Sequence, residues 1–106
     1  MSATLDNLFA IIASRKGGDP DTSYTAKLLA AGVEKCAKKF GEEATEAVIA
    51  AIQKDKTELA KESADVLYHL LVLWAASGIT PQDVYAVLQS REGLSGLEEK
   101  ASRPKT

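Results

Sequence analysis

Residues 55–77 predict a long helix that is polar at its start and apolar on nearly every side from residue 66 to residue 76. A helix that is apolar on every side has to be covered on every side. A chain of 106 residues has few other elements with which to cover it. We therefore expect a homodimer, in which the surface around Leu67, Leu71 and Trp74 is buried by the bundle or by the partner.

The spacing of apolar residues predicts helices along the whole chain, and no segment shows the alternation of a strand. The expected helices cover residues 5–14, 23–31, 33–54, 55–77 and 81–91, with a loop at 15–21. Their expected N-caps are Ser2 or Thr4, Thr22 or Ser23, Asp55 or Thr57, and Thr80. We expect an all-α fold, a bundle of about five helices completed by dimerisation. Residues 1–92 would form one domain, and residues 93–106 a polar, frayed C-terminal tail.

Composition and charge narrow the functional classes. A formal net charge of −2 argues against general nucleic-acid binding, which uses a basic face. The first residues lack the basic start and apolar run of a secretory signal, and the near-apolar run at 66–76 is too short to span a membrane. The single cysteine, Cys36, lies among apolar helical positions and is expected in the core of a protein from a reducing compartment. We therefore expect a cytoplasmic protein without nucleic-acid or membrane partners.

Two pairs of carboxylates, Glu43-x-x-Glu46 and Glu62-x-x-Asp65, indicate a metal site. Residues three apart on a helix project from nearly the same side. Two such pairs on neighbouring antiparallel helices would place four negative charges in one small space, where they repel unless cations or protons bind. Oxygen ligands without histidine or cysteine suit Mg2+ or Mn2+ and disfavour zinc and copper.

The helical positions of these carboxylates favour a site at the edge of the core. Glu62 falls on the apolar side of its helix, Asp65 lies at the edge of that side, and His69 falls between them. Glu43 flanks the inner face of the preceding helix, and Glu46 lies just beyond it. That inner face is expected to consist of Phe40, Ala44, Ala47, Val48 and Ala51. A glutamate at the edge of a core is costly unless it is paired or bound to metal.

The carboxylates could instead form a network of ion pairs with nearby lysines, namely Lys35, Lys38, Lys39 and Lys61. Spacing alone does not choose between this network and a metal site. A ferritin-like di-iron bundle is disfavoured, because it needs Glu-x-x-His pairs and the second pair here ends in Asp65. Glu42 and His69, the only histidine, are candidates for positions next to the metal ligands, and His69 is expected to be buried rather than a ligand.

Three segments make the chain similar to a known family: Ser23-Tyr-Thr-Ala-Lys-Leu-Leu, Lys39-Phe-Gly-Glu-Glu-Ala-Thr-Glu46 and Glu62-Ser-Ala-Asp-Val-Leu-Tyr-His-Leu-Leu71. They resemble the phosphoribosyl-ATP pyrophosphatases of histidine biosynthesis, a branch of the all-α, MazG-like nucleotide pyrophosphohydrolases. The carboxylate signature is common to the superfamily, whereas the Ser-Tyr-Thr and Lys-x-Gly-Glu-Glu blocks are more specific to this branch. The resemblance covers about residues 5–92, and Phe40 departs from it by replacing a smaller aliphatic residue.

The resemblance implies a Mg2+-dependent hydrolase, with Mn2+ as a possible substitute, and a dimeric helical bundle. Its reaction is the second step of L-histidine biosynthesis, which cleaves the α–β phosphoanhydride of phosphoribosyl-ATP to give phosphoribosyl-AMP and pyrophosphate. The metal would neutralise phosphate charge and activate a water for in-line attack. Its ligands would be Glu43, Glu46, Glu62 and Asp65. Either Glu43 or Glu46 would take the proton of the water.

Several basic and hydroxyl groups are candidates for binding the substrate. Lys39 lies one turn before Glu43 and can reach phosphate oxygens near the ion. Further candidates in the loop and the following helix start, where backbone N–H groups favour anions, are Arg15, Lys16, Ser23 and Lys27. Two other functions stay open: a housekeeping hydrolase of ordinary or damaged (deoxy)nucleoside triphosphates, and a non-catalytic helical dimerisation module whose acidic pairs bridge lysines.

Overall fold

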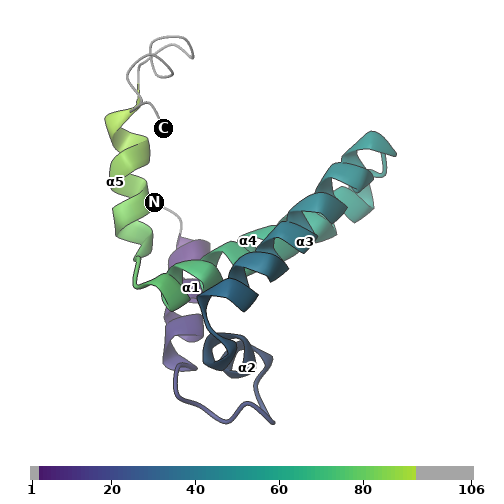
Figure 1. Ribbon diagram of the computed structural model, residues 1–106. Helices are drawn as coiled ribbons and strands as arrows, with labels where there is room; N and C mark the ends of the chain where they lie inside the picture. The colour runs from purple at the N-terminus through teal and green to yellow at the C-terminus, as the bar shows by residue number, and fades with distance from the viewer. Residues whose placement is uncertain (1–2, 93–106) are drawn as a thin grey trace.

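The computed structural model describes residues 3–92, and within them the chain forms five helices and no strand (Figure 1). The helices are α1 (Ala3–Ser14), α2 (Tyr24–Ala31), α3 (Val33–Ile52), α4 (Lys56–Ser77) and α5 (Pro81–Ser90). The expected all-α class and helix order are confirmed. The polar tail predicted at 93–106 lies outside the described residues.

Polar capping side chains and one residue with a positive φ angle determine the helix ends. Ser23 and Asp55 accept the backbone N–H groups of Ala26 and Glu58, and so cap α2 and α4. Thr80 caps α5 in a capping box with Asp83. The candidate caps Thr4 and Thr57 lie inside α1 and α4 instead. The prediction that α3 continues to residue 54 was wrong by two residues, because Lys54 turns the chain with a φ of 60°.

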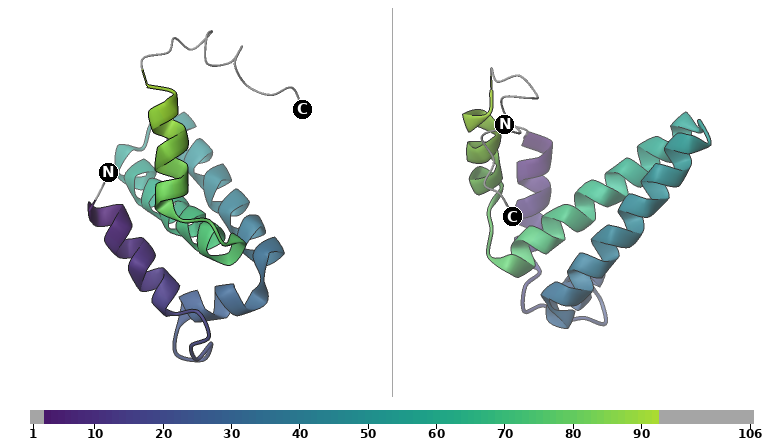
Figure 2. Two further views of the ribbon diagram at one scale, coloured as in Figure 1. Left: turned by 90° about the vertical axis from the view of Figure 1, so that its left-hand side faces the viewer. Right: turned by 45° about the horizontal axis from the view of Figure 1, so that its top comes forward.

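An antiparallel hairpin of α3 and α4 runs through the molecule, with the other helices gathered at one end of it (Figure 2). The core lies at that end. Its buried side chains come from α1, α2, α3 and α4, and they are Ile12, Leu28, Cys36, Leu71 and Val72. The Cys36 thiol donates to the Leu28 carbonyl at 3.3 Å, and burial raises the pKa of this thiol. Cys36 is therefore a core residue, as predicted.

The far end of the hairpin consists of α3 and α4 alone (Figure 1). No further helix covers α3 at this end, so Val48 is 57% exposed and Ala51 is also exposed. The prediction that these two residues belong to the inner face was wrong. On α4, Leu71 is buried by its own chain, Trp74 is half-buried and Leu67 is 43% exposed. One side of the apolar half of α4 is thus open in the single chain.

After α4 the chain turns at Gly78, whose φ of 79° suits a residue without a side chain. The next helix, α5, approaches α1 through the side chain of Tyr85. The Tyr85 hydroxyl of α5 donates to the Asp6 carboxylate of α1 at 3.0 Å and ties the two helices together. No single helix within residues 3–92 is long and apolar enough to cross a membrane. Taken together, α4 and α5 reach the required length and composition, but the pair is bent by 107°.

Candidate metal centre

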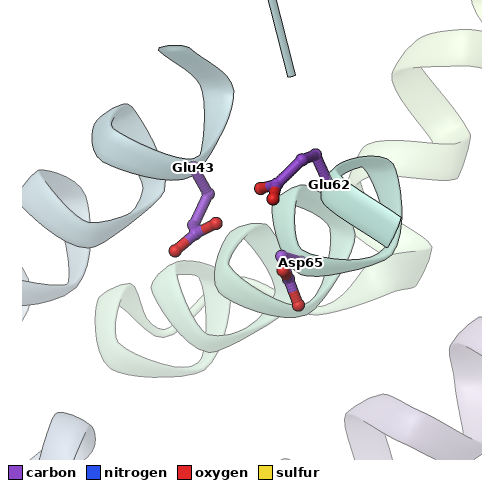
Figure 3. A group of neighbouring side chains, drawn as sticks. All are labelled: Glu43, Glu62 and Asp65. Atoms are coloured by element: carbon purple, nitrogen blue, oxygen red, sulfur yellow. The ribbon is translucent and has the colours of Figure 1, made fainter. Parts of the chain in front are cut away.

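Carboxylates from both arms of the hairpin meet at one place. Glu43 projects from α3, and Glu62 and Asp65 project from α4, toward a common space (Figure 3). One oxygen of each lies within 4.8 Å of the others. The antiparallel packing of α3 and α4 puts the two turns opposite each other, so the predicted convergence is confirmed for these three residues.

Two oxygens of this cluster are buried without a partner. The Oε2 atoms of Glu43 and Glu62 have no hydrogen-bond partner within the described chain. A buried carboxylate oxygen that lacks a partner destabilises the fold, because it has lost its water and gained nothing in return. A cation bound between the oxygens, or a proton on one of them, removes this cost.

The electrostatics of the cluster agree with this arrangement. Burial is the largest cause of a rise in the pKa of Glu62 to about 7, and the neighbouring carboxyls of Glu46, Glu58 and Glu43 contribute to the same rise. Burial also raises the pKa of Glu43, with the Glu46 and Asp65 carboxyls adding to the effect. The Glu43 and Glu62 carboxyls thus resist ionisation in the metal-free chain, which is what a site built for a positive ion should show.

Glu46 lies beside the three-residue cluster. It lines a cavity of about 230 Å³ together with Glu62, Glu58 and three neighbours, Ile49, Ala50 and Gln53. Glu46 is thus adjacent to the cluster without being part of its closest group of oxygens. Glu58 was missed in the sequence, although it stands four residues before Glu62, a spacing that puts both carboxylates on one side of α4.

A lysine network does not account for the carboxylates. Within residues 3–92, none of the four predicted ligands has a basic nitrogen within 4.0 Å. Lys39 pairs instead with Glu42, at 3.4 Å. This pair is half-exposed; Lys39 lies one turn before Glu43 on α3, and Glu42 directly precedes Glu43 in the sequence. The Glu42 carboxylate therefore holds Lys39 next to the cluster.

His69 is buried, as predicted, but one of its nitrogens is not satisfied. Its ring makes T-shaped contacts with the rings of Tyr68 and Tyr24, with centroids 5.0 and 6.3 Å away, and no partner within the described residues reaches its Nδ1 atom. Burial lowers the pKa of His69, and nearby Lys39 acts in the same direction, against the opposing charges of Asp65 and Glu42. His69 thus lies near the acidic cluster, which itself consists of oxygen donors alone. Such donors fit a hard divalent ion such as Mg2+ or Mn2+.

The remaining substrate candidates are separated from one another. Arg15 and Lys16 are exposed in the turn after α1, and no hydrogen bond or ion pair within residues 3–92 joins them to the carboxylates. The Ser23 hydroxyl accepts the N–H of Ala26 at 3.1 Å, so it serves the start of α2. Lys27 lies on α2 and faces a cavity that it shares with Lys39.

The pKa of Glu62 predicts how stability depends on pH. This pKa is about 7 in the folded chain and near 4.5 in the unfolded chain, so the folded state holds more protons between these values. The stabilising contribution is fully present below about pH 4.5 and is lost as the pH rises to about 7. We expect the thermal midpoint of the metal-free protein to fall between about pH 5 and pH 8, measured by circular dichroism.

Glu62→Gln is the control for this titration, because a glutamine cannot ionise. The variant should lose the part of the decrease that Glu62 contributes, and added Mg2+ at about pH 8 should raise the midpoint of the wild type more than that of the variant. Parallel curves for the two proteins would contradict this assignment.

The comparisons with known proteins agree with the geometry. The family model described as phosphoribosyl-ATP pyrophosphohydrolase matches residues 5–92. A phosphoribosyl-ATP pyrophosphatase of Ruegeria sp. (strain TM1040) is 62% identical over 101 residues, which cover 95% of this chain and 96% of that protein. Proteins of the same name from Cereibacter sphaeroides (strain ATCC 17029 / ATH 2.4.9) and Paramagnetospirillum magneticum are 61% and 60% identical, over 93% and 98% of this chain and 96% and 95% of their own lengths. The chain belongs to the phosphoribosyl-ATP pyrophosphohydrolase family.

Proposed function

We propose that this protein hydrolyses the α–β phosphoanhydride of phosphoribosyl-ATP to phosphoribosyl-AMP and pyrophosphate, the second step of L-histidine biosynthesis. One observation carries the proposal: three carboxylates from α3 and α4 lie within 4.8 Å of one another, with two of their oxygens buried and unpartnered, in a chain of this family. Such a site suits a divalent ion and a triphosphate.

Each carboxylate of the cluster has a part in the proposed reaction. Glu43, Glu62 and Asp65 would hold the ion, which we propose to be Mg2+, with Mn2+ as a substitute. When bound, the ion would supply positive charge for the phosphates and for the leaving pyrophosphate. Glu46, beside the cluster and open to its cavity, accepts the proton of the attacking water. We thus favour Glu46 over Glu43 as the base, because Glu43 is engaged with its oxygens in the cluster.

Lys39 is proposed to contact the triphosphate. Its ammonium is held by Glu42 one turn from Glu43, where it can reach phosphate oxygens without adding a ligand to the ion. We expect Lys39→Ala to raise KM or lower kcat about tenfold and to keep Mg2+ affinity within a few fold. Turnover kinetics and Mg2+ titrations of the free protein measure the two effects. A lysine that only screens the acidic cluster would instead tighten Mg2+ binding when removed, and unchanged kinetics would exclude Lys39 from the site.

The decisive test of the proposed activity is a pyrophosphate-release assay with Mg2+. Phosphoribosyl-ATP is compared with ATP, deoxyATP and oxidised nucleoside triphosphates at equal concentrations. The proposal requires that phosphoribosyl-ATP gives the highest kcat/KM. A preference for ordinary or damaged triphosphates would favour the housekeeping hydrolase, and no release from any substrate would favour the non-catalytic module.

A homodimer is proposed as the functional form. Apolar side chains are exposed on the far part of α3, on α4 and on α5, and they include Val48, Ile49, Ile52, Leu67, Val87 and Leu88. Leaving so many apolar side chains in water is unfavourable, and a second copy of the chain would cover them. We expect sedimentation to report a dimer at micromolar concentration; a monomer there would contradict the proposal. The cytoplasmic location and the lack of nucleic-acid or membrane partners stay predictions.

A further inference from the structure

A cavity of about 240 Å³ lies between α2 and α3, apart from the carboxylate cluster. Half of the residues that line it are lysines: its walls are Tyr24, Lys27, Leu28, Ala31, Lys35 and Lys39. Lys39 is paired with Glu42, whereas neither Lys27 nor Lys35 has a carboxylate within 4.0 Å in the described part of the chain. Three ammonium groups around one cavity repel each other, and a bound anion would relieve this repulsion.

The cavity continues the site along α3. Lys35, Lys39 and Glu43 are spaced by four residues, so they follow one another on the same side of the helix. Lys35 lies two turns, about 12 Å along the axis, from Glu43. That is further than the next phosphate of a triphosphate lies from the one beside the ion. The Lys27 and Lys35 end of the cavity is therefore placed for a different part of a long anionic substrate.

Tyr24 lines the cavity, and contacts with α4 fix its position. Its ring makes a T-shaped contact with the His69 ring on α4, and the neighbouring Thr25 hydroxyl hydrogen-bonds to the Tyr68 hydroxyl of α4. His69 is itself buried. Tyr24 is nevertheless 53% exposed, so it remains accessible to a ligand. An aromatic surface next to ammonium groups suits a sugar phosphate or a base.

We propose that this cavity binds the phosphoribosyl phosphate of the substrate through Lys27 and Lys35, with Tyr24 against the adjoining sugar. The inference rests on the proposed function. Cleavage at the α–β linkage requires the triphosphate at the carboxylates, and the only other phosphate group on phosphoribosyl-ATP is its phosphomonoester at the opposite end. ATP lacks this group, so the two lysines distinguish the substrate from the much simpler nucleotide.

The kinetic test removes each lysine charge and keeps the length of its side chain. Lys27→Met and Lys35→Met should each raise KM for phosphoribosyl-ATP about tenfold, with kcat largely unchanged, because a phosphate contact far from the reacting bond contributes to binding in the ground and transition states alike. Lys38→Met is the matched control. Lys38 is exposed on α3, lies between the two sites in sequence and does not line the cavity, so its KM should stay at the wild-type value.

A binding test with partial ligands separates the two ends of the substrate. Ribose 5-phosphate and pyrophosphate are each titrated into the protein without divalent metal, and amide shifts are followed by NMR. Ribose 5-phosphate should shift the signals of residues 24–28 and 35, and its affinity should fall about tenfold in both lysine variants. Pyrophosphate affinity should not change in them. If the variants instead lose affinity for pyrophosphate, the lysines bind the triphosphate, and the assignment is overturned.

The outcomes also distinguish this inference from the proposed activity. If the wild type hydrolyses phosphoribosyl-ATP and both lysine variants keep its KM, the activity stands and the phosphoribosyl site is excluded. If Lys38→Met raises KM as much as the other two variants do, the effect comes from the general loss of positive charge, and the site is excluded as well. If ribose 5-phosphate binds at Lys27 and Lys35 while no phosphoribosyl-ATP is hydrolysed, the phosphate site stands and the activity fails.

Discussion

Glu62→Gln should reduce turnover of phosphoribosyl-ATP on the order of 10³-fold while the helices remain folded. The substitution keeps the size of the side chain and removes one charge from the three-residue cluster. Without metal, the variant should be at least as stable as the wild type at about pH 8, because it lacks the Glu62 carboxylate, whose ionisation is unfavourable in the folded chain. Turnover is measured by pyrophosphate release, and stability by thermal unfolding.

Two matched variants make this result specific. Glu34→Gln removes an exposed carboxylate near the start of α3 and should leave turnover unchanged. Glu46→Gln should lose turnover to a similar degree but keep Mg2+ affinity within about tenfold, because Glu46 is proposed as the base and not as a ligand. Near-normal Mg2+-dependent hydrolysis by Glu62→Gln would sink the metal-centre proposal.

Leu71→Ala should destabilise the fold by about 2–5 kcal/mol. The Leu71 side chain is 1% exposed and packs with Ile12, Leu28 and Val72 where four helices meet. The truncation would leave a cavity in the core, and a domain of this size has only about 5–15 kcal/mol of stability in total. Denaturant unfolding measures the loss.

Leu67→Ala is the matched control, since it is the same change one turn earlier on α4. Leu67 is 43% exposed in the single chain, so its truncation should cost about 1 kcal/mol or less if nothing covers it. If a second copy covers Leu67, the cost should grow with protein concentration, because the stability of a dimer depends on it. Equal losses for the two leucines in dilute protein would contradict the assignment of Leu71 to the core of the single chain.

The helices were predictable because their signals are local. The residues that fix the helix ends lie within a few residues of those ends. They are the capping side chains of Ser23, Asp55 and Thr80, and Gly78 with its positive φ angle. The end of α3 was less predictable, since nothing in the sequence requires Lys54 to adopt a positive φ. Helix ends that depend on a tight turn are decided by how the next helix packs.

The carboxylate cluster was predictable in its members and only partly in its arrangement. The three-residue spacing put Glu43 with Glu46, and Glu62 with Asp65, on shared sides of two helices. Spacing within one helix does not fix how two helices are set against each other. The packing of α3 on α4 therefore decided that Glu46 lies beside the closest group of oxygens, and that Glu58 joins its surroundings.

The sequence by itself determined the all-α class, the order of the helices, the acidic pairs and the similarity to a family, because each depends on neighbouring residues or on short spacings. Only the tertiary structure decided which side of each helix is covered. Val48 and Leu67 are apolar like Leu71, yet they are exposed because no helix of the same chain lies over them. It also decided that the four carboxylates have no lysine partners within residues 3–92, and that Lys27 and Lys35 line the same cavity. These facts follow from the placement of whole helices, to which residues far apart in the sequence contribute together.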